Sequence, residues 1–209
     1  MNRNWRQSEF SRRMGVARDV LVICLIILAV TIDAGPAVAS LDSAKEAFKR
    51  GDEAEAVREI ISLAEAGDVE AQFHLGELYQ NGRGVPQDDQ KAHDWYMKAA
   101  EEGHAKAQFQ LGFLYYNGLG VKKSLSEALM WYRLSANKGD IWAQNNVGLM
   151  YRDGIGAAKD WIKAYMWLSL AADQGFIIAK KNRDEIAGLM EPEEISQAEG
   201  MLDKFRSRE

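Results

Sequence analysis

The sequence predicts an all-α solenoid, in which antiparallel helix pairs stack in chain order. Three tryptophans recur at an interval of 36 residues, at Trp95, Trp131 and Trp167. A glycine and an alanine keep the same interval over four copies, at Gly67, Gly103, Gly139 and Gly175 and at Ala71, Ala107, Ala143 and Ala179. Between these positions, apolar residues recur at helical spacing. Self-similarity at a period of roughly 20–50 residues is typical of stacked supersecondary units.

Residues 1–39 have the composition of a targeting segment rather than of a repeat. Five arginines precede an uncharged apolar run over residues 20–32, and Ala37 and Ala39 follow it. This order is that of a secretory signal peptide, so we expect cleavage after Ala39 and export of the repeats to the periplasm. As a helix the run would rise about 20 Å, which is short of the roughly 30 Å hydrocarbon core. An uncleaved inner-membrane anchor, with the repeats facing the periplasm, is therefore the weaker alternative.

The charge balance of the exported part argues against a nucleic-acid partner. The targeting segment carries five arginines and three acidic residues, which leaves 21 basic and 28 acidic residues and a net charge of −7. No basic stripe is available to follow phosphates. Cys24, the one cysteine, lies inside the targeting segment, so the exported part has neither disulfides nor thiolate ligands.

Residues 40–66 form the predicted N-terminal helical cap, which corresponds to a truncated repeat. Apolar residues at helical spacing indicate two helices. Gly51 is expected to end the first helix and Asp52 to cap the second. A shift of 36 residues places Ala56 on Ala92, so the second helix matches the second helix of a full repeat.

Three full repeats follow, over residues 67–102, 103–138 and 139–174, and each predicts two helices. Asp68 and Asp140 are expected to cap the first helix of their repeats. That helix ends at a glycine, because the turn there needs a positive φ. These glycines are Gly82, Gly118 and Gly154. The second helices are expected to start near Asp88, Ser124 and Asp160.

A further glycine lies in the middle of each first helix, at Gly76, Gly112 and Gly148. Glycine in a helix costs about 0.5–1 kcal/mol relative to alanine, so a packing reason is expected. We expect the tryptophan of the paired helix to approach closely at this point, because a small position facing a large one interlocks two helices.

These residues resemble a known family. The pattern A-Q-x-x-L-G-x-x-Y-x-x-G-x-G-V over residues 71–85, followed by K-A-x-x-W-Y-x-K-A-A over residues 91–100, resembles the Sel-one-like repeat, a longer relative of the tetratricopeptide repeat. The resemblance covers residues 67–175 and implies a right-handed superhelix. Arg183 and Asp184 stand where a fourth repeat would have leucine and glycine, so residues 176–209 are expected to form C-terminal capping helices. The first should run to about Met190, and Pro192 should open the second.

Catalytic and metal-binding chemistry has little support in the sequence. His74, His93 and His104 lie at different repeat positions and lack helical pairing, so no metal site and no cofactor are expected. Some proteins of the resembling family have been called β-lactamases. Ser43 and Lys45 lack the spacing of the Ser-x-x-Lys pattern that such chemistry uses, so we expect no catalytic residue.

A comparison between the repeats points instead to a binding surface. The first helices differ most at three positions, which are three and four residues apart and therefore share one face. In the related tetratricopeptide fold, this face lines the concave groove. The expected groove residues are Phe73, Glu77, Phe109, Phe113, Trp142, Asn145 and Leu149. The alternative for Phe73 and Phe109 is that they only fill space between repeats.

The sequence therefore predicts a non-catalytic exported scaffold that binds a protein or peptide in its groove. Two alternatives remain open at this point. One is a cell-envelope hydrolase or a glycan-binding accessory factor, and the other is a purely structural component of a larger envelope complex.

Overall fold

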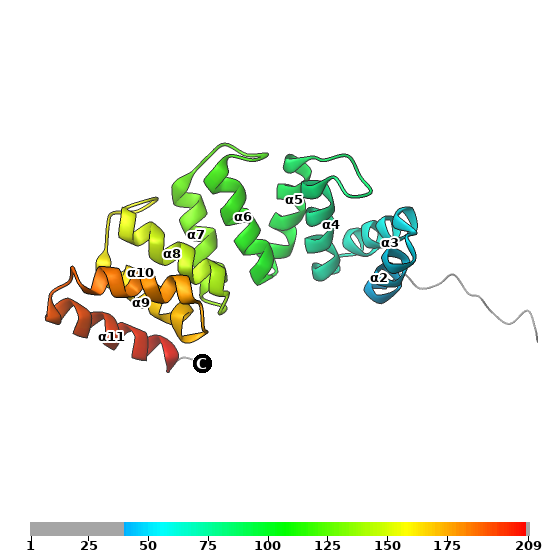
Figure 1. The fold of residues 1–209 in the computed structure, drawn as a ribbon. Helices are drawn as coiled ribbons and strands as arrows, with labels where there is room; N and C mark the ends of the chain where they lie inside the picture. Colours follow the sequence, from blue (N-terminus) through cyan, green and yellow to red (C-terminus); the bar gives the residue numbers. More distant parts are fainter. Residues whose placement is uncertain (1–39, 208–209) are drawn as a thin grey trace, which may run out of the picture. The chain divides into compact units, whose positions relative to one another are not determined.

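The computed structural model describes residues 40–207, and this part of the chain is helical, with turns between the helices and no strand. The predicted all-α solenoid of antiparallel helix pairs is confirmed (Figure 1). The predicted signal peptide lies outside the described residues. The helices are α2 (Leu41–Arg50), α3 (Glu53–Glu65), α4 (Val69–Asn81), α5 (Asp89–Glu101), α6 (Ala105–Asn117), α7 (Leu125–Ala136), α8 (Ile141–Asp153), α9 (Trp161–Asp173), α10 (Ile177–Ala187) and α11 (Pro192–Arg206).

The helices pack in pairs, and the pairs stack in chain order (Figure 1). The most extensive contacts are within repeats, between α4 and α5, α6 and α7, and α8 and α9. The second helix of each pair then contacts the first helix of the next pair. The hydrophobic core follows this arrangement, because each cluster of buried side chains in residues 40–207 spans neighbouring pairs. The clusters lie over α2–α4, α4–α7 and α7–α11.

The predicted helix ends within residues 40–174 agree with the structure, with one exception. Asp68 and Asp140 accept the backbone N–H groups of Ala71 and Ala143 at 2.7 and 2.8 Å. The second helices have Asp88, Ser124 and Asp160 as their N-caps. The glycines that end the first helices, Gly82, Gly118 and Gly154, have φ values of 63°, 76° and 71°. The prediction for Asp52 was wrong: it stands at the N-cap of α3, but its side chain makes no capping bond.

The prediction for the mid-helix glycines was right about their purpose and wrong about their partner. A Cβ atom on Gly76 would lie 2.5 Å from the ring of Tyr96, and one on Gly112 would lie 2.5 Å from the ring of Tyr132. In the third repeat, Gly148 faces Leu168. The close neighbour is thus the residue after the tryptophan, because the second helix turns that side chain toward the first.

A buried glutamine links each pair to the one before it. Gln108 donates from Nε2 to the carbonyl oxygen of Ala100 at 3.1 Å, and Gln72 and Gln144 repeat this bond to Ala64 and Ala136. Each acceptor lies in the last turn or cap region of the preceding second helix, where carbonyl groups lack intrahelical partners. The recurring glutamine therefore gives a carbonyl group a side-chain donor at the three junctions that lead into α4, α6 and α8, whereas Lys180 takes its place where α9 meets α10.

The C-terminal helices close the stack differently from a further repeat. Both α10 and α11 pack on α9. Pro192 is the first residue of α11, as predicted, whereas α10 ends at Ala187, shortly before the predicted Met190. Phe205 of α11 packs edge-on against Trp167 of α9, with 5.4 Å between ring centroids. None of the helices in residues 40–207 combines the length and the hydrophobicity that a membrane crossing requires.

Candidate protein-binding face

The residues predicted to line a groove lie on α4, α6 and α8, the first helices of the three repeats. The structure buries two of them. Phe73 is 4% exposed and stacks on the His104 ring with 4.6 Å between centroids, and Asn145 is 7% exposed. Their assignment to the groove is corrected, since neither side chain reaches the surface. For Phe73, filling space between repeats was the alternative interpretation, and its contact with the next repeat supports it.

Two further residues of the predicted set make mainly internal contacts. Phe109 is half-buried, and its ring lies 5.4 Å from that of Tyr132. Glu77 accepts a hydrogen bond from His74, with 2.8 Å between the carboxylate oxygen and Nδ1. Both remain partly accessible.

Trp142 is the most exposed of the predicted residues, at 57%. Its ring packs edge-on against Phe176, which precedes α10, with 4.7 Å between centroids. It does not line a cleft with the other predicted residues. Trp142 thus connects the third repeat to the C-terminal cap and leaves most of its surface to solvent.

Phe113 and Leu149 are brought together in a cleft between α6 and α8, with Tyr132 of α7 also lining it. This α6–α8 cleft has a volume of about 360 Å³. Phe113 is 37% exposed within it. The lining residues are Phe113, Tyr116, Asn117, Tyr132, Asn146, Leu149, Met150, Asp153 and Ile155.

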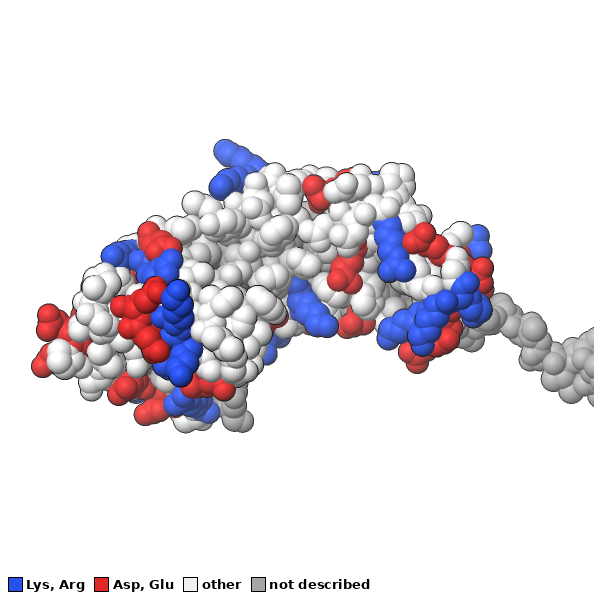
Figure 2. All heavy atoms as spheres, viewed as in Figure 1, with Lys and Arg blue, Asp and Glu red and all other residues white. Residues whose placement is uncertain are grey.

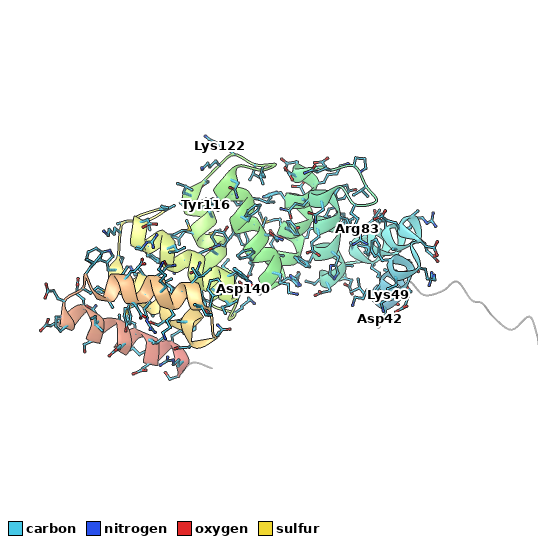
Figure 3. The ribbon with its side chains drawn as sticks, in the orientation of Figure 1. Asp42, Lys49, Arg83, Tyr116, Lys122 and Asp140 are labelled. Atoms are coloured by element: carbon cyan, nitrogen blue, oxygen red, sulfur yellow. The ribbon has the colours of Figure 1, made fainter. Side chains whose placement is uncertain are left out.

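Sequence reasoning missed several of these lining residues, among them Tyr116 of α6, which Figure 3 labels. The sequence does contain a signal for Tyr116, because its position holds Gln80 in the first repeat and Arg152 in the third. It therefore varies between repeats as much as the three positions from which the groove is predicted. Tyr116 also lies three residues after Phe113, on the same helix face.

The chemistry of the α6–α8 cleft is apolar with a few polar groups at its edges. Phe113, Leu149 and Ile155 supply the apolar surface. Burial raises the pKa of the Tyr132 phenol well above its ordinary value, so its hydroxyl stays neutral at physiological pH. The cleft therefore suits an apolar side chain, with hydrogen-bonding groups close by.

The histidines have structural contacts rather than a shared site. His104 occupies the N-cap of α6, where its Nδ1 accepts the N–H of Ala107 at 3.1 Å. Its Nε2 lies 3.0 Å from a carboxylate oxygen of Glu70. Burial alone would raise the pKa of Glu70, but the hydrogen bond with Nε2 of His104 and the nearby charge of Lys106 outweigh this and lower it. Within residues 40–207, no group of three or more His, Cys, Asp or Glu side chains is placed to hold a metal ion.

Charge is unevenly distributed on the face drawn in Figure 2. Lysine, arginine and acidic side chains gather over α2–α3 and over α10–α11, and fewer lie over the helices between them. The middle repeats therefore present a largely uncharged surface on this face.

Known proteins resemble this chain in both sequence and structure. The family model of the Sel1 repeat matches residues 69–104, 105–140 and 143–176. A Sel1 repeat protein from Oxalobacter formigenes has a similar structure, with 33% identity and a TM-score of 0.65, over 69% of this chain and 59% of that one. The protective antigen c5321 of uropathogenic Escherichia coli, which displays an SLR fold, is 34% identical with a TM-score of 0.58, over 67% of this chain and 34% of that one. The chain thus spans less than two thirds of either relative. No curated protein matches the sequence.

Proposed function

The chain belongs to the Sel1 repeat family, and we propose that it is a non-catalytic exported scaffold that holds a segment of another protein in the α6–α8 cleft. The observation that carries this proposal is the exposure of apolar side chains there, with Phe113 37% exposed beside Leu149. The fold does not require an apolar residue at this position, because the first repeat has Glu77 in the same place. A partner side chain that fills the cleft would remove this apolar surface from water.

The partner class follows from the form of the cleft. It is open to solvent and lies on a face that recurs along α4, α6 and α8. Its volume of about 360 Å³ is enough for one or two side chains, and near the lower limit of roughly 300–1,000 Å³ for small-molecule sites. A protein segment lying across the helices can add contacts on both sides of the cleft, where a small molecule would find only the cleft itself.

A capture experiment with matched variants tests the scaffold. The tagged protein is cross-linked in its own cells and purified, and co-purifying proteins are quantified by mass spectrometry. We expect a stoichiometric partner that is lost with Phe113→Asp and retained with Met130→Asp, because Met130 on α7 is similarly exposed, at 43%, and lies outside the cleft. Retention of the partner by the Phe113→Asp variant would rule out the α6–α8 cleft as the binding site. Turnover of a cell-wall glycan or a β-lactam by the purified protein would show that it is a hydrolase and would contradict the scaffold proposal.

Export is the second part of the proposal and is supported by residues 1–39 of the sequence. Cleavage after Ala39 would leave Ser40 as the new N-terminus. Ser40 is the N-cap of α2, where its hydroxyl accepts the N–H of Ser43 at 3.0 Å, so the cleaved chain would begin where the first described helix begins.

Mass spectrometry of the protein from fractionated cells tests the export. We expect a periplasmic species that starts at Ser40. An intact Met1 in the membrane fraction would indicate the retained anchor instead, and an intact Met1 in the cytoplasm would refute export.

A further inference from the structure

A second cleft repeats the α6–α8 cleft at a distance of two repeats. It has a volume of about 340 Å³ and lies where α2 and α3 meet α4. Adding 72 to the numbers of nine of its ten lining residues gives the nine lining residues of the α6–α8 cleft. Leu41 thereby corresponds to Phe113, and Ile60 to Tyr132. This α2–α4 cleft is therefore the same architectural site, built at the other end of the array.

The two clefts differ in chemistry although they agree in position. Where the α6–α8 cleft has Leu149 and Ile155, the α2–α4 cleft has Glu77 and Arg83. Asn117 is likewise replaced by Lys45. One cleft accepts an apolar side chain, and the other presents ionic groups to whatever lies across it.

The charges of the α2–α4 cleft favour an anionic group. Glu77 is already hydrogen-bonded to His74 at 2.8 Å. The guanidinium of Arg83, labelled in Figure 3, lies 4.2 Å above the ring of Phe48 and donates from Nε to a carboxylate oxygen of Glu53 at 3.1 Å, and its side chain remains 58% exposed. Lys45 is 59% exposed and lies 3.7 Å from the carboxylate of Asp42.

Exposed ion pairs of this kind contribute little to stability, because water screens their attraction. Lys45 and Arg83 can therefore exchange their present partners for a ligand carboxylate at small cost. The lining of the cleft thus contains two cations, whose carboxylate partners Asp42 and Glu53 lie outside the lining, and one carboxylate, which is held by a histidine within it.

We propose that the ligand is one extended polypeptide segment with two anchors, an apolar side chain for the α6–α8 cleft and a carboxylate for the α2–α4 cleft. This proposal rests on the proposed function and specifies its ligand. Directly packed helices lie about 8–10 Å apart, and the contacts run in chain order from α2 through α3, α4 and α5 to α6, so four such steps separate the two clefts by at most about 40 Å. An extended chain covers about 3.3–3.6 Å per residue, which places the anchors no more than about twelve residues apart.

Selection of peptides on the purified full-length protein tests the two anchors. The probe is a displayed library of random peptides of about sixteen residues, which is long enough to reach both clefts. We expect the selected peptides to share an aromatic or aliphatic residue and, at a constant spacing of no more than about twelve residues, an Asp, a Glu or the C-terminal carboxylate. Splitting a selected peptide between the anchors should weaken binding by at least about tenfold, because neither half then gains from the other.

Variants of the two clefts separate this proposal from the function on which it rests. The double variant Lys45→Glu and Arg83→Glu, which reverses the charge of the cleft, should bind an acidic peptide about tenfold more weakly. Selection on this variant should instead yield peptides with Lys or Arg at the same spacing. Lys49→Glu is the matched control, because Lys49 lies on α2 outside the cleft, and it should change neither result. Circular dichroism confirms that each variant is folded.

The outcomes are distinguishable. Peptides that depend on Phe113 but show no acidic preference and no response to charge reversal would overturn the two-anchor ligand and leave the scaffold intact. Peptides that bind without dependence on Phe113 would overturn both.

Discussion

Individual glycines determine how closely successive repeats can approach. The second glycine of each inter-helix loop, Gly84, Gly120 or Gly156, lies against the preceding pair. At Gly120, a Cβ atom would lie 2.3 Å from the carbonyl carbon and oxygen of Asp89, which are backbone atoms that cannot turn aside. Its φ of 65° also favours glycine. Two independent constraints therefore act at one residue.

Gly120→Ala is expected to lower the free energy of unfolding by about 2–4 kcal/mol. Of this, about 1–2 kcal/mol comes from the left-handed conformation and the remainder from the forced separation of α5 and its neighbouring loop. Gly139→Ala is the control, since Gly139 has a φ of 86° and no atom within 4 Å of the place that a Cβ atom would take. Urea denaturation measures both. Equal losses would show that backbone conformation alone, and not the contact with Asp89, makes glycine necessary at position 120.

At the scale of the helix, the features that the sequence predicted well are those set by local chemistry. Capping depends on residues three apart in the chain, so Asp88, Ser124 and Asp160 were identifiable from spacing alone. The partner of Gly112 was not, because Trp131 and Tyr132 are adjacent in sequence and only the rotation of α7 decides which of them faces α6. Periodicity fixes which residues share a face but leaves this rotation open.

The acid sensitivity of α9 provides a test at this scale. Asp160 accepts the N–H of Lys163 at 2.9 Å, and its other oxygen lies 2.7 Å from the Lys163 ammonium. Burial alone would raise the pKa of Asp160, but these bonds outweigh it and hold the pKa below the ordinary value of 3.8. Because the folded-state pKa is lowered, the stabilisation is complete above about pH 3.8 and is lost as the pH falls through the folded value.

In the Asp160→Asn variant, the free energy of unfolding should therefore fall less steeply between about pH 5 and pH 2 than in the parent. The amide keeps a hydrogen-bond acceptor but has no carboxylate to protonate. Asp160→Ala removes the cap and should cost about 1 kcal/mol at neutral pH. Urea midpoints measured across this pH range give both values. A profile of Asp160→Asn identical to that of the parent would show that the Lys163 contacts do not persist in solution.

At the scale of the whole array, the sequence predicted the repeats well and the binding face only in part. A variable position can be variable because it is exposed or because its packing partner changes from repeat to repeat. Phe73 is of the second kind, since it packs on His104, whose place in the third repeat is taken by Asp140. Phe113 is of the first kind. Only the packing of successive pairs separates the two cases, and a single sequence does not contain it.

Trp131 and Trp142 test this distinction between framework and surface. Trp131 is 9% exposed and belongs to the cluster that spans α4–α7, whereas Trp142 is 57% exposed and packs mainly on Phe176. Trp131→Ala should cost about 3–5 kcal/mol. Trp142→Ala should cost roughly 1 kcal/mol, the contribution of one aromatic pair.

Because each pair contacts only its neighbours, damage at the centre of the array should also uncouple the two ends. The Trp131→Ala variant is therefore expected to unfold over a broader range of urea concentration, with different midpoints for tryptophan fluorescence and for circular dichroism. Trp142→Ala should keep a single sharp transition, since Trp142 lies beside the C-terminal cap and interrupts no junction between central repeats. If both variants lost equal stability with equally sharp transitions, Trp142 would be part of the framework and the array would unfold as one unit.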